Sequence, residues 1–369
     1  MKKILALVLI AVMGLSVLTG CGVNQDAKTI YILGPTPDHG WTAQAGAYAE
    51  QKATEINAAG KYKAVYMPAS TGEEQVDLVQ MIIANGDAAG VVFFALEDSA
   101  KAGQEALIVN NIPFISFDRI IEGPDKYAIL NASGDNWQCG AGIAYWLQQK
   151  GMLPGDTMIT LIGDNGTVCT RRQEGFEQFL KGELSYYDEH TKQTYQTNKI
   201  WSQAEIDALC ADYKVVCNWS ADGAYDYLEQ KLTDITADAK SNGGKLFIYS
   251  MDDEMTFGVM RLLEGNSLSD ATKNDLANMD VYISAIGGMQ ELYDVISGAS
   301  SQSAIATTYF DDMMSVYFSP KMMMNVVGYM VDYLDGNWTY EVGSGKYEPV
   351  WIVDKNNVSQ YEGFTGHAK

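Results

Sequence analysis

The chain has 369 residues, of which 25 are basic and 47 are acidic, and its formal net charge is -22. This acidic excess argues against binding to nucleic acid or to an anionic membrane surface, where phosphate groups must be neutralised by clustered Lys and Arg. Apolar residues make up 47% of the chain and charged residues 20%, which is ordinary globular composition and excludes wholesale disorder. A chain of this length is expected to form about two domains, each able to bury a hydrophobic core.

The first twenty residues are typical of an export signal. Two lysines precede an apolar run over residues 4–18, which is too short for a comfortable membrane span. The Leu-Thr-Gly-Cys sequence ending at Cys21 resembles a bacterial lipobox, in which the cysteine takes a diacylglycerol group and becomes the new N-terminus. We therefore predict a lipoprotein signal peptide over residues 1–20, lipidation at Cys21 and a tether over residues 21–28. An uncleaved anchor helix and a plain secretory signal are the alternatives.

From Thr29 onward, short β-rich runs alternate with stretches of helical periodicity. The runs predicted as strands cover residues 30–33, 64–67, 91–94, 113–117, 127–130, 158–162, 246–249 and 281–284. Their near-continuous apolar character indicates that both faces of each strand are covered, as in parallel sheets. Between them apolar residues recur with a helical period, as at Val76, Val79, Ile82 and Ile83.

These strands are too many for one sheet of ordinary size. The alternation of strands and helices therefore predicts an α/β fold made of two doubly wound α/β lobes with parallel sheets. Residues 183–218 are rich in Tyr, Thr, Asp and Lys and break this rhythm. We interpret this stretch as an insertion or elaborated loop in the second lobe.

Histidine and cysteine offer little catalytic or metal-binding chemistry. The chain has three histidines, so His-based nucleophilic, acid/base or metal chemistry is poorly supplied. Four cysteines follow Cys21, and none forms a C-x-x-C pair typical of zinc or thioredoxin-like sites. Cys139 and Cys169 lie in apolar helical contexts and are predicted as small core residues. Cys210 and Cys217 are close enough in sequence for a local disulfide, and the sequence leaves a disulfide and free thiols equally open.

Polar and aromatic side chains follow the predicted strands at the edge where open α/β sheets bind ligands. These side chains are Trp41, Asp98, Asp118, Arg119, Arg172, Trp219, Asp252 and Asp253. Aromatic rings stack on the apolar C–H faces of a sugar, carboxylates accept hydrogen bonds from its hydroxyls, and guanidinium groups donate in pairs. The set is therefore typical of a carbohydrate site.

Each of these residues also has a purely structural interpretation. An Asp after a strand is often a helix N-cap, which is the favoured interpretation of Asp98 and Asp253. Trp41 and Trp219 are also compatible with ordinary packing, and Arg172 with a surface ion pair. Their shared placement on one rim favours the ligand site.

Four short segments carry a resemblance to a known family. They are Phe-Asp-Arg at 117–119, Arg-Gln-Glu-Gly-Phe at 172–176, Met-Asp-Asp-Glu-Met at 251–255 and Ile-Val-Asp-Lys-Asn-Asn-Val at 352–358. In this order and spacing, and with Trp41 in the first loop, they resemble the ribose/galactose-type periplasmic sugar-binding proteins. These proteins are the receptors of sugar ABC importers, and the resemblance extends over nearly the whole mature chain.

The resemblance implies a type I periplasmic binding protein fold, in which three crossovers form the hinge of a two-lobe clamp. The implied sugar contacts are Trp41, Asp118, Arg119, Arg172, Trp219 and Asp252. The expected lobes are residues 29–132 plus 312–351 and residues 133–311 plus 352–369, and the expected hinge strands lie near residues 131–133, 308–312 and 351–353.

Two positions depart from the family pattern. Ala95 falls where many relatives carry an asparagine, and Gly287 where several carry an aspartate. These departures leave the identity of the sugar open. Tyr309, Asp311 and Asp312 lie near the expected second crossover and are candidates to compensate.

The leading interpretation is an exported lipoprotein on the outer face of the cell membrane. It would capture a monosaccharide or similar small polyol between its lobes and deliver it to an ABC permease. A sensory receptor that presents a sugar or furanose signal to a membrane kinase or chemoreceptor is the alternative. A glycosidase using Asp118 and Asp252 is disfavoured, because Arg119 beside Asp118 would lower the pKa of that carboxyl and spoil a general acid. We expect a monomer that uses no cofactor or metal and binds no nucleic acid.

Overall fold

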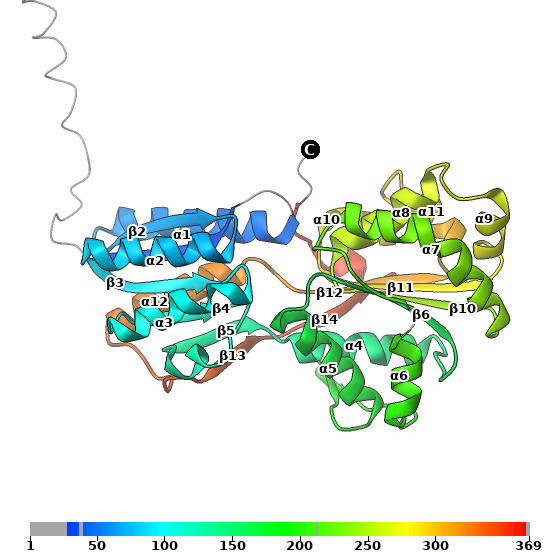
Figure 1. The fold of residues 1–369 in the computed structure, drawn as a ribbon, viewed down its shortest axis with the longest axis horizontal. Helices are drawn as coiled ribbons and strands as arrows, with labels where there is room; N and C mark the ends of the chain where they lie inside the picture. Colours follow the sequence, from blue (N-terminus) through cyan, green and yellow to red (C-terminus); the bar gives the residue numbers. More distant parts are fainter. Residues whose placement is uncertain (1–27, 37–39, 212, 367–369) are drawn as a thin grey trace, which may run out of the picture.

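In the computed structural model, described for residues 28–36, 40–211 and 213–366, two α/β lobes lie side by side (Figure 1). The predicted signal peptide, the lipidation site Cys21 and residues 22–27 of the tether lie outside the described residues. Within the described ranges, no helix combines the length and the apolar character needed to cross a membrane.

Lobe 1 is built on a six-stranded parallel sheet of order β13-β5-β4-β3-β1-β2. Its strands are β1 (Thr29–Pro35), β2 (Lys63–Ala69), β3 (Ala88–Phe94), β4 (Phe114–Phe117), β5 (Leu130–Gly134) and β13 (Gly345–Glu348). Its helices are α1 (Gly40–Ala59), α2 (Gly72–Asn85), α3 (Lys101–Val109) and α12 (Met322–Leu334), with short 3-10 helices at η1 (Asp98–Ala100) and η2 (Pro124–Tyr127). Helices α1 and α12 pack together, as do α2 and α3.

Lobe 2 is built on a six-stranded sheet of order β14-β12-β11-β10-β6-β9, in which only the β12–β14 pairing is antiparallel. Its strands are β6 (Thr157–Ile162), β9 (Tyr213–Val216), β10 (Lys245–Ser250), β11 (Asp280–Gly287), β12 (Asp312–Tyr317) and β14 (Trp351–Asp354). On one side of the sheet lie α4 (Asn136–Gln149), α5 (Thr167–Leu180) and α6 (Gln203–Ala211) (Figure 1). On the other lie α7 (Ala221–Ser241), α8 (Asp253–Glu264), α9 (Asp270–Leu276), α10 (Gln290–Ser297) and α11 (Ser303–Tyr309), and the 3-10 helix η3 (Val358–Gln360) follows β14.

The apolar runs identified in the sequence form the buried strands of both sheets. Strands β1 and β6 are buried along their whole length, as expected for parallel strands with helices on both faces. The strand predicted over residues 127–130 begins only at Leu130. The residues before it form η2, because Pro124 sets the backbone angle that starts a helical turn, and Tyr127 at the end of this turn is 61% exposed.

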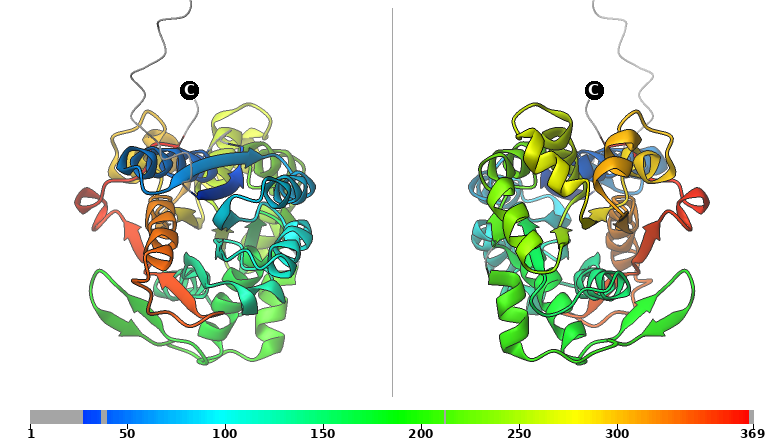
Figure 2. Two further views of the ribbon diagram at one scale, coloured as in Figure 1. Left: turned by 90° about the vertical axis from the view of Figure 1, so that its left-hand side faces the viewer. Right: turned by 90° about the vertical axis from the view of Figure 1, so that its right-hand side faces the viewer.

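The stretch 183–218 is only partly an insertion. It contains a hairpin of β7 (Tyr186–Asp188) and β8 (Gln193–Tyr195), which extends away from the body of lobe 2 (green in Figure 2), and helix α6. Strand β9, however, pairs with β6 and forms an edge of the main sheet. Exposed and half-buried residues alternate along β9, so this strand lacks the continuous apolar run by which the buried strands were predicted.

The chain crosses between the sheets after β5, after β12 and between β13 and β14. The lobe boundary predicted at residue 312 is wrong, because Asp312–Tyr317 pairs with β11 in the sheet of lobe 2. The second crossing therefore follows Tyr317, and not residues 308–312. This strand is hard to recognise in the sequence, because the buried Ser315 interrupts its apolar run.

All four described cysteines are free thiols. Cys139 in α4 and Cys169 in α5 are buried in the core, as predicted. Cys210 and Cys217, for which the sequence left a disulfide open, are not bonded to each other. Burial raises the pKa of the Cys217 thiol to about 12, which is the behaviour of an inert structural cysteine.

Candidate ligand-binding site

A cavity of about 730 Å³ lies between the two lobes, where the carboxyl ends of both sheets meet. All six residues predicted to contact a ligand line it, namely Trp41, Asp118, Arg119, Arg172, Trp219 and Asp252. Further lining residues that the sequence did not single out as ligand contacts include Phe94, Asp164, Asn165, Glu254 and Phe318. In the part of the chain that the structure describes, no group of three His, Cys, Asp or Glu side chains is arranged to hold a metal ion.

Trp41 belongs to an aromatic wall of the cavity. It lies in the first turn of α1, and its ring centroid is 5.8 Å from that of Phe94 and 5.5 Å from that of Phe318. The indole nitrogen donates a 2.7 Å hydrogen bond to the backbone oxygen of Phe318, directly after β12. Because this bond uses the only polar atom of the indole, Trp41 presents apolar ring surface to the cavity.

Asp118 follows β4 directly and has a left-handed backbone with a φ of 60°. Asp118 is half-buried and lines the cavity, and its carboxylate accepts no hydrogen bond from the other described residues, so this group is available to a ligand. Burial raises its pKa, while the charges of Arg172 and Arg119 oppose the shift. Arg119 thus acts in the expected direction, but removal of the carboxylate from bulk water outweighs its cationic neighbours, so the net shift of the pKa is upward.

Arg119 bridges the two lobes instead of lying free in the cavity. It follows β4 in lobe 1, and its Nη2 donates a 2.6 Å hydrogen bond to Oδ2 of Asp164, directly beyond β6 in lobe 2. A longer contact of 3.5 Å joins Nη1 to Asp98. Although burial opposes the shift, the Arg119 guanidinium holds the pKa of Asp164 below its usual value.

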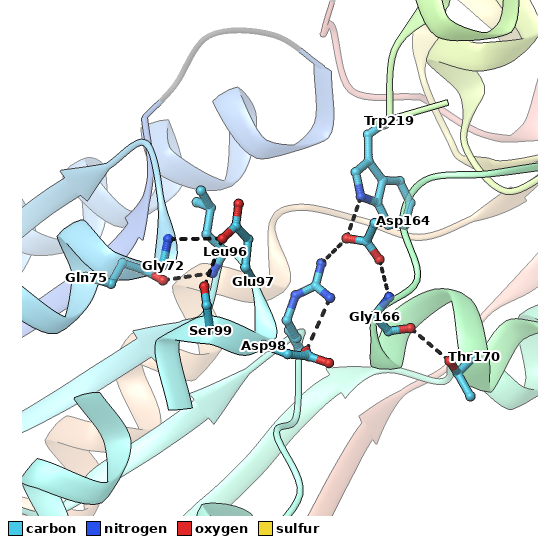
Figure 3. A network of polar contacts seen from close by, with 11 residues as sticks. Gly72, Gln75, Leu96, Glu97, Asp98, Ser99, Asp164, Gly166, Thr170 and Trp219 are labelled. Atoms are coloured by element: carbon cyan, nitrogen blue, oxygen red, sulfur yellow. Dashed lines mark hydrogen bonds and ion pairs between the residues drawn. The ribbon is translucent and has the colours of Figure 1, made fainter. Parts of the chain in front are cut away.

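Asp164 is the main site residue that sequence reasoning missed. The same Oδ2 atom that binds Arg119 accepts a 3.0 Å hydrogen bond from the indole nitrogen of Trp219, and Oδ1 accepts one of 2.7 Å from the backbone of Gly166 (Figure 3). A signal was present, since Asp164 follows a predicted strand within the sequence Gly-Asp-Asn-Gly at 163–166.

Arg172 is buried and is not a surface ion pair. Its Nε donates a 2.8 Å hydrogen bond to Asn136, and Nη1 donates to the backbone oxygen of Met251. The guanidinium carbon lies 5.5 Å from the ring centroid of Trp219 and 5.1 Å from that of Phe318. Arg172 therefore ties α5 to α4 and to the end of β10 while it lies against two aromatic rings of the cavity.

The backbone at Asn218 and Trp219 is strained. Both residues are left-handed, with φ of 52° and 57°, which is uncommon for any residue other than glycine and costly for a bulky one. Five described non-glycine residues have positive φ, and three of them, Asp118, Asn218 and Trp219, line this cavity. Such strain gathers at functional sites, where the surrounding structure enforces it.

Asp252, which lines the cavity, is also the residue that caps α8, a role that was expected of Asp253. Asp252 is the N-cap of α8 and accepts a 2.8 Å hydrogen bond from the backbone of Glu254, and its burial raises its pKa well above the usual value. Asp253 lies inside the helix and accepts hydrogen bonds from Gly288, Met289 and the Ser315 hydroxyl. The predicted cap at Asp253 is therefore wrong, because the helix begins one residue earlier than assumed, at Asp253 itself.

Asp98 is not a side-chain cap either. It lies within η1, whose N-cap residue Glu97 makes no side-chain capping bond. The Asp98 side chain instead makes the long contact to Arg119 at the edge of the cavity, where it is 48% exposed.

The two departures from the family pattern lie on the cavity wall. A side chain at Gly287 would place its Cβ 2.7 Å from Oδ2 of Asp253, so the carboxylate of Asp253 occupies the space that an aspartate there would need. The expected compensation by residues near 310 is wrong. Asp311 accepts a hydrogen bond from Val281, and Asp312 pairs with Lys150 at the start of β12, at the edge of the sheet opposite the cavity.

Two lobes joined by three crossings, with a ligand-sized cavity between the carboxyl ends of their strands, define a hinged binding protein. Residues 30–337 match the family described as periplasmic binding protein domain, and the chain belongs to this family. The predicted membership is confirmed, and the protein is a solute-binding protein and not an enzyme. A search of curated proteins finds no match to the chain.

Solved structures share this fold over nearly the whole chain at low sequence identity. The arabinose-binding component of an ABC transporter from Shewanella sp. ANA-3 is 16% identical with a TM-score of 0.64, covering 90% of this chain and 93% of that one. A galactofuranose-binding protein is 15% identical with a TM-score of 0.66, covering 90% and 96%. The Caulobacter myo-inositol-binding protein is 14% identical with a TM-score of 0.67, covering 93% and 98%. These likenesses confirm the predicted two-lobe α/β fold.

The buried Asp253 predicts a measurable pH dependence of stability. Burial raises its pKa to about 6, above the usual value of 3.8. Because the folded-state pKa lies above the unfolded one, the stabilisation is fully present below about pH 4 and is lost as the pH rises through 6. An Asp253→Asn variant keeps an acceptor for the backbone donors and does not titrate. Between pH 4 and pH 7, the wild type should lose about 2–3 kcal/mol more unfolding free energy than this variant, as measured by urea denaturation. Parallel pH profiles would contradict this assignment.

Proposed function

We propose that this protein is an exported lipoprotein that captures a small neutral sugar or polyol between its lobes and delivers it to an ABC permease. The observation that carries the proposal is the half-buried Asp118 carboxylate, which lines the cavity without a hydrogen bond from the described residues. A carboxylate in this state can accept hydrogen bonds, and sugar hydroxyls can donate them. Arg119 and Arg172 lie close enough to shift its pKa, so a ligand hydroxyl that donates to Asp118 would also meet cations.

The apolar part of the cavity supports the same ligand class. Trp41 and Trp219 each use their indole N–H within the protein, so the part of each ring that lines the cavity offers apolar surface to the C–H groups of a sugar. A cavity of about 730 Å³ falls within the range of roughly 300–1,000 Å³ that is usual for small-molecule sites. In this proposal the ligand contacts are Trp41, Asp118, Arg119, Arg172, Trp219 and Asp252.

The structural relatives support a sugar or polyol without naming one. The arabinose-binding component binds arabinofuranose, and the Caulobacter protein binds myo-inositol. The arabinose-binding relative is a component of an ABC transporter, which supports delivery to a permease. The sensory alternative uses the same site, and identification of the membrane partner distinguishes the two roles.

A thermal-shift screen of pentoses, hexoses and polyols should identify the ligand. A compound at 100 times its Kd should stabilise the fold by about 2.7 kcal/mol. For that compound, Asp118→Asn should weaken binding by about 2 kcal/mol, or roughly 30-fold in Kd, because hydrogen bonds to a charged acceptor are lost. Asparagine tolerates the left-handed backbone at this position, so the fold should be kept.

Titration calorimetry on protein lacking residues 1–21 provides the measurement. Asp335→Asn is the matched control, because it removes the same charge beside Lys61, away from the cavity lining. Wild-type affinity in the Asp118→Asn variant would place the ligand elsewhere. Failure of every neutral sugar and polyol to bind would reject the proposed ligand class.

Lipid anchoring at Cys21 is part of the proposal and rests on the lipobox. Each buried CH₂ of an acyl chain contributes about 0.8 kcal/mol, and two chains give stable anchoring. A Cys21→Ser variant expressed with its signal should be released from the membrane fraction. If this variant still sediments with membranes at high salt, the anchor lies elsewhere.

A further inference from the structure

The turn over residues 163–166, which belongs to lobe 2, contacts two cavity residues from other segments of the chain. Asp164 binds Arg119 of lobe 1 at 2.6 Å and Trp219 at 3.0 Å through the same oxygen (Figure 3). Its other oxygen is held by the backbone N–H of Gly166 at 2.7 Å, which fixes the carboxylate within the turn. The turn thus connects an arginine of lobe 1 to an aromatic ring of lobe 2.

Both glycines of this turn make room for those side chains. A Cβ at Gly166 would lie 1.8 Å from Nη1 of Arg119, and a Cβ at Gly163 would lie 2.1 Å from the ring of Trp219. Neither glycine has a left-handed backbone, so conformational freedom is not the reason for glycine here. Glycine is needed because a side chain would occupy the space of the Arg119 guanidinium at one end of the turn and that of the Trp219 indole at the other.

Asp164 is the stronger of the two carboxylate partners of Arg119. Arg119 is 5% exposed, and its Nε is buried without an acceptor among the described residues. Its second carboxylate contact, to Asp98, is longer at 3.5 Å, and Asp98 is 48% exposed, so water screens that contact. Removal of Asp164 would therefore leave a buried guanidinium with only a weak partner.

We propose that residues 163–166 form an interlobe socket that seats Arg119 and thereby holds the unliganded lobes together, with Asp164 as the positioning residue for both Arg119 and Trp219. This inference deepens the proposed function and rests on it only for its effect on sugar release. Opening of the lobes would withdraw Arg119 from the socket and remove one of the two side chains that donate to Oδ2 of Asp164. Asp164 thus links the position of Arg119 in lobe 1 to that of the Trp219 ring in lobe 2.

The two glycines allow the halves of the socket to be tested separately and without any sugar. Gly166→Ala should exclude Arg119 and open the lobes, which increases the radius of gyration measured by small-angle scattering. Gly163→Ala should displace the ring of Trp219 while the Arg119 contact persists, so acrylamide quenching of tryptophan fluorescence should increase without a change in radius. Asp164→Ala should produce both effects.

Two controls complete the design. Gly328→Ala in α12 meets only one atom, 4.0 Å away, and should match the wild type in both measurements. In a Trp219→Phe background, Gly163→Ala should no longer change the quenching, which assigns the signal to Trp219. Thermal denaturation identifies any variant that fails to fold, and the two single-glycine variants serve as replacements for Asp164→Ala if it does.

Equal radii for the wild type and Gly166→Ala would overturn the proposal, as would a larger radius in Gly163→Ala than in Gly166→Ala. No sugar enters these measurements, so a failed ligand screen would reject the proposed function and leave the socket standing. For a sugar found in the screen, Gly166→Ala should change the dissociation rate constant by a larger factor than the association rate constant. The dissociation rate constant should increase. An unchanged dissociation rate would contradict the coupling to sugar release.

Discussion

The cavity depends on one constraint, which is that the carboxyl ends of two parallel sheets face each other across three chain crossings. The loops that follow these strands border the cavity between the lobes, so residues far apart in the sequence meet there. Asp118 arrives after β4, Asp164 after β6 and Asp252 after β10. Since the crossings lie at the hinge, any motion of one lobe changes the distance between these loops. The fold therefore makes binding and lobe position interdependent.

Within that space, the protein satisfies most of its own polar groups and leaves few for a ligand. Asp164 accepts hydrogen bonds from Arg119 and Trp219, and Asp252 caps α8. The Asp118 carboxylate, in contrast, accepts no hydrogen bond from the other described residues, and it lies at one of the strained backbone positions of the cavity. Strain and an unsatisfied carboxylate both raise the free energy of the empty site, and a ligand that donates hydrogen bonds recovers part of it. This arrangement favours selectivity for ligands with hydroxyls in the right place.

The sequence allowed the fold to be predicted where strands are buried on both faces, because such strands are continuous apolar runs. It failed for β9 and β12, whose apolar runs are interrupted by Lys214 and by Ser315. All six proposed ligand residues could be placed at the cavity, since strand ends mark it. The pairing of Arg119 with Asp164 could not be predicted, because it joins two lobes and no local pattern encodes which strand ends face each other. The capping of α8 by Asp252 instead of Asp253 likewise depends on the one residue at which this helix begins.

If the ligand binds in the cavity between the lobes, it contacts both lobes at the same time. Hydrogen exchange measured by mass spectrometry, with and without the sugar found in the screen, tests it most directly. With the sugar bound, amide exchange should be slower in peptides covering residues 117–119 of lobe 1. In the same sample, it should also be slower in peptides covering residues 163–172 and 217–220 of lobe 2. Protection confined to one lobe, or located away from these strand ends, would contradict it.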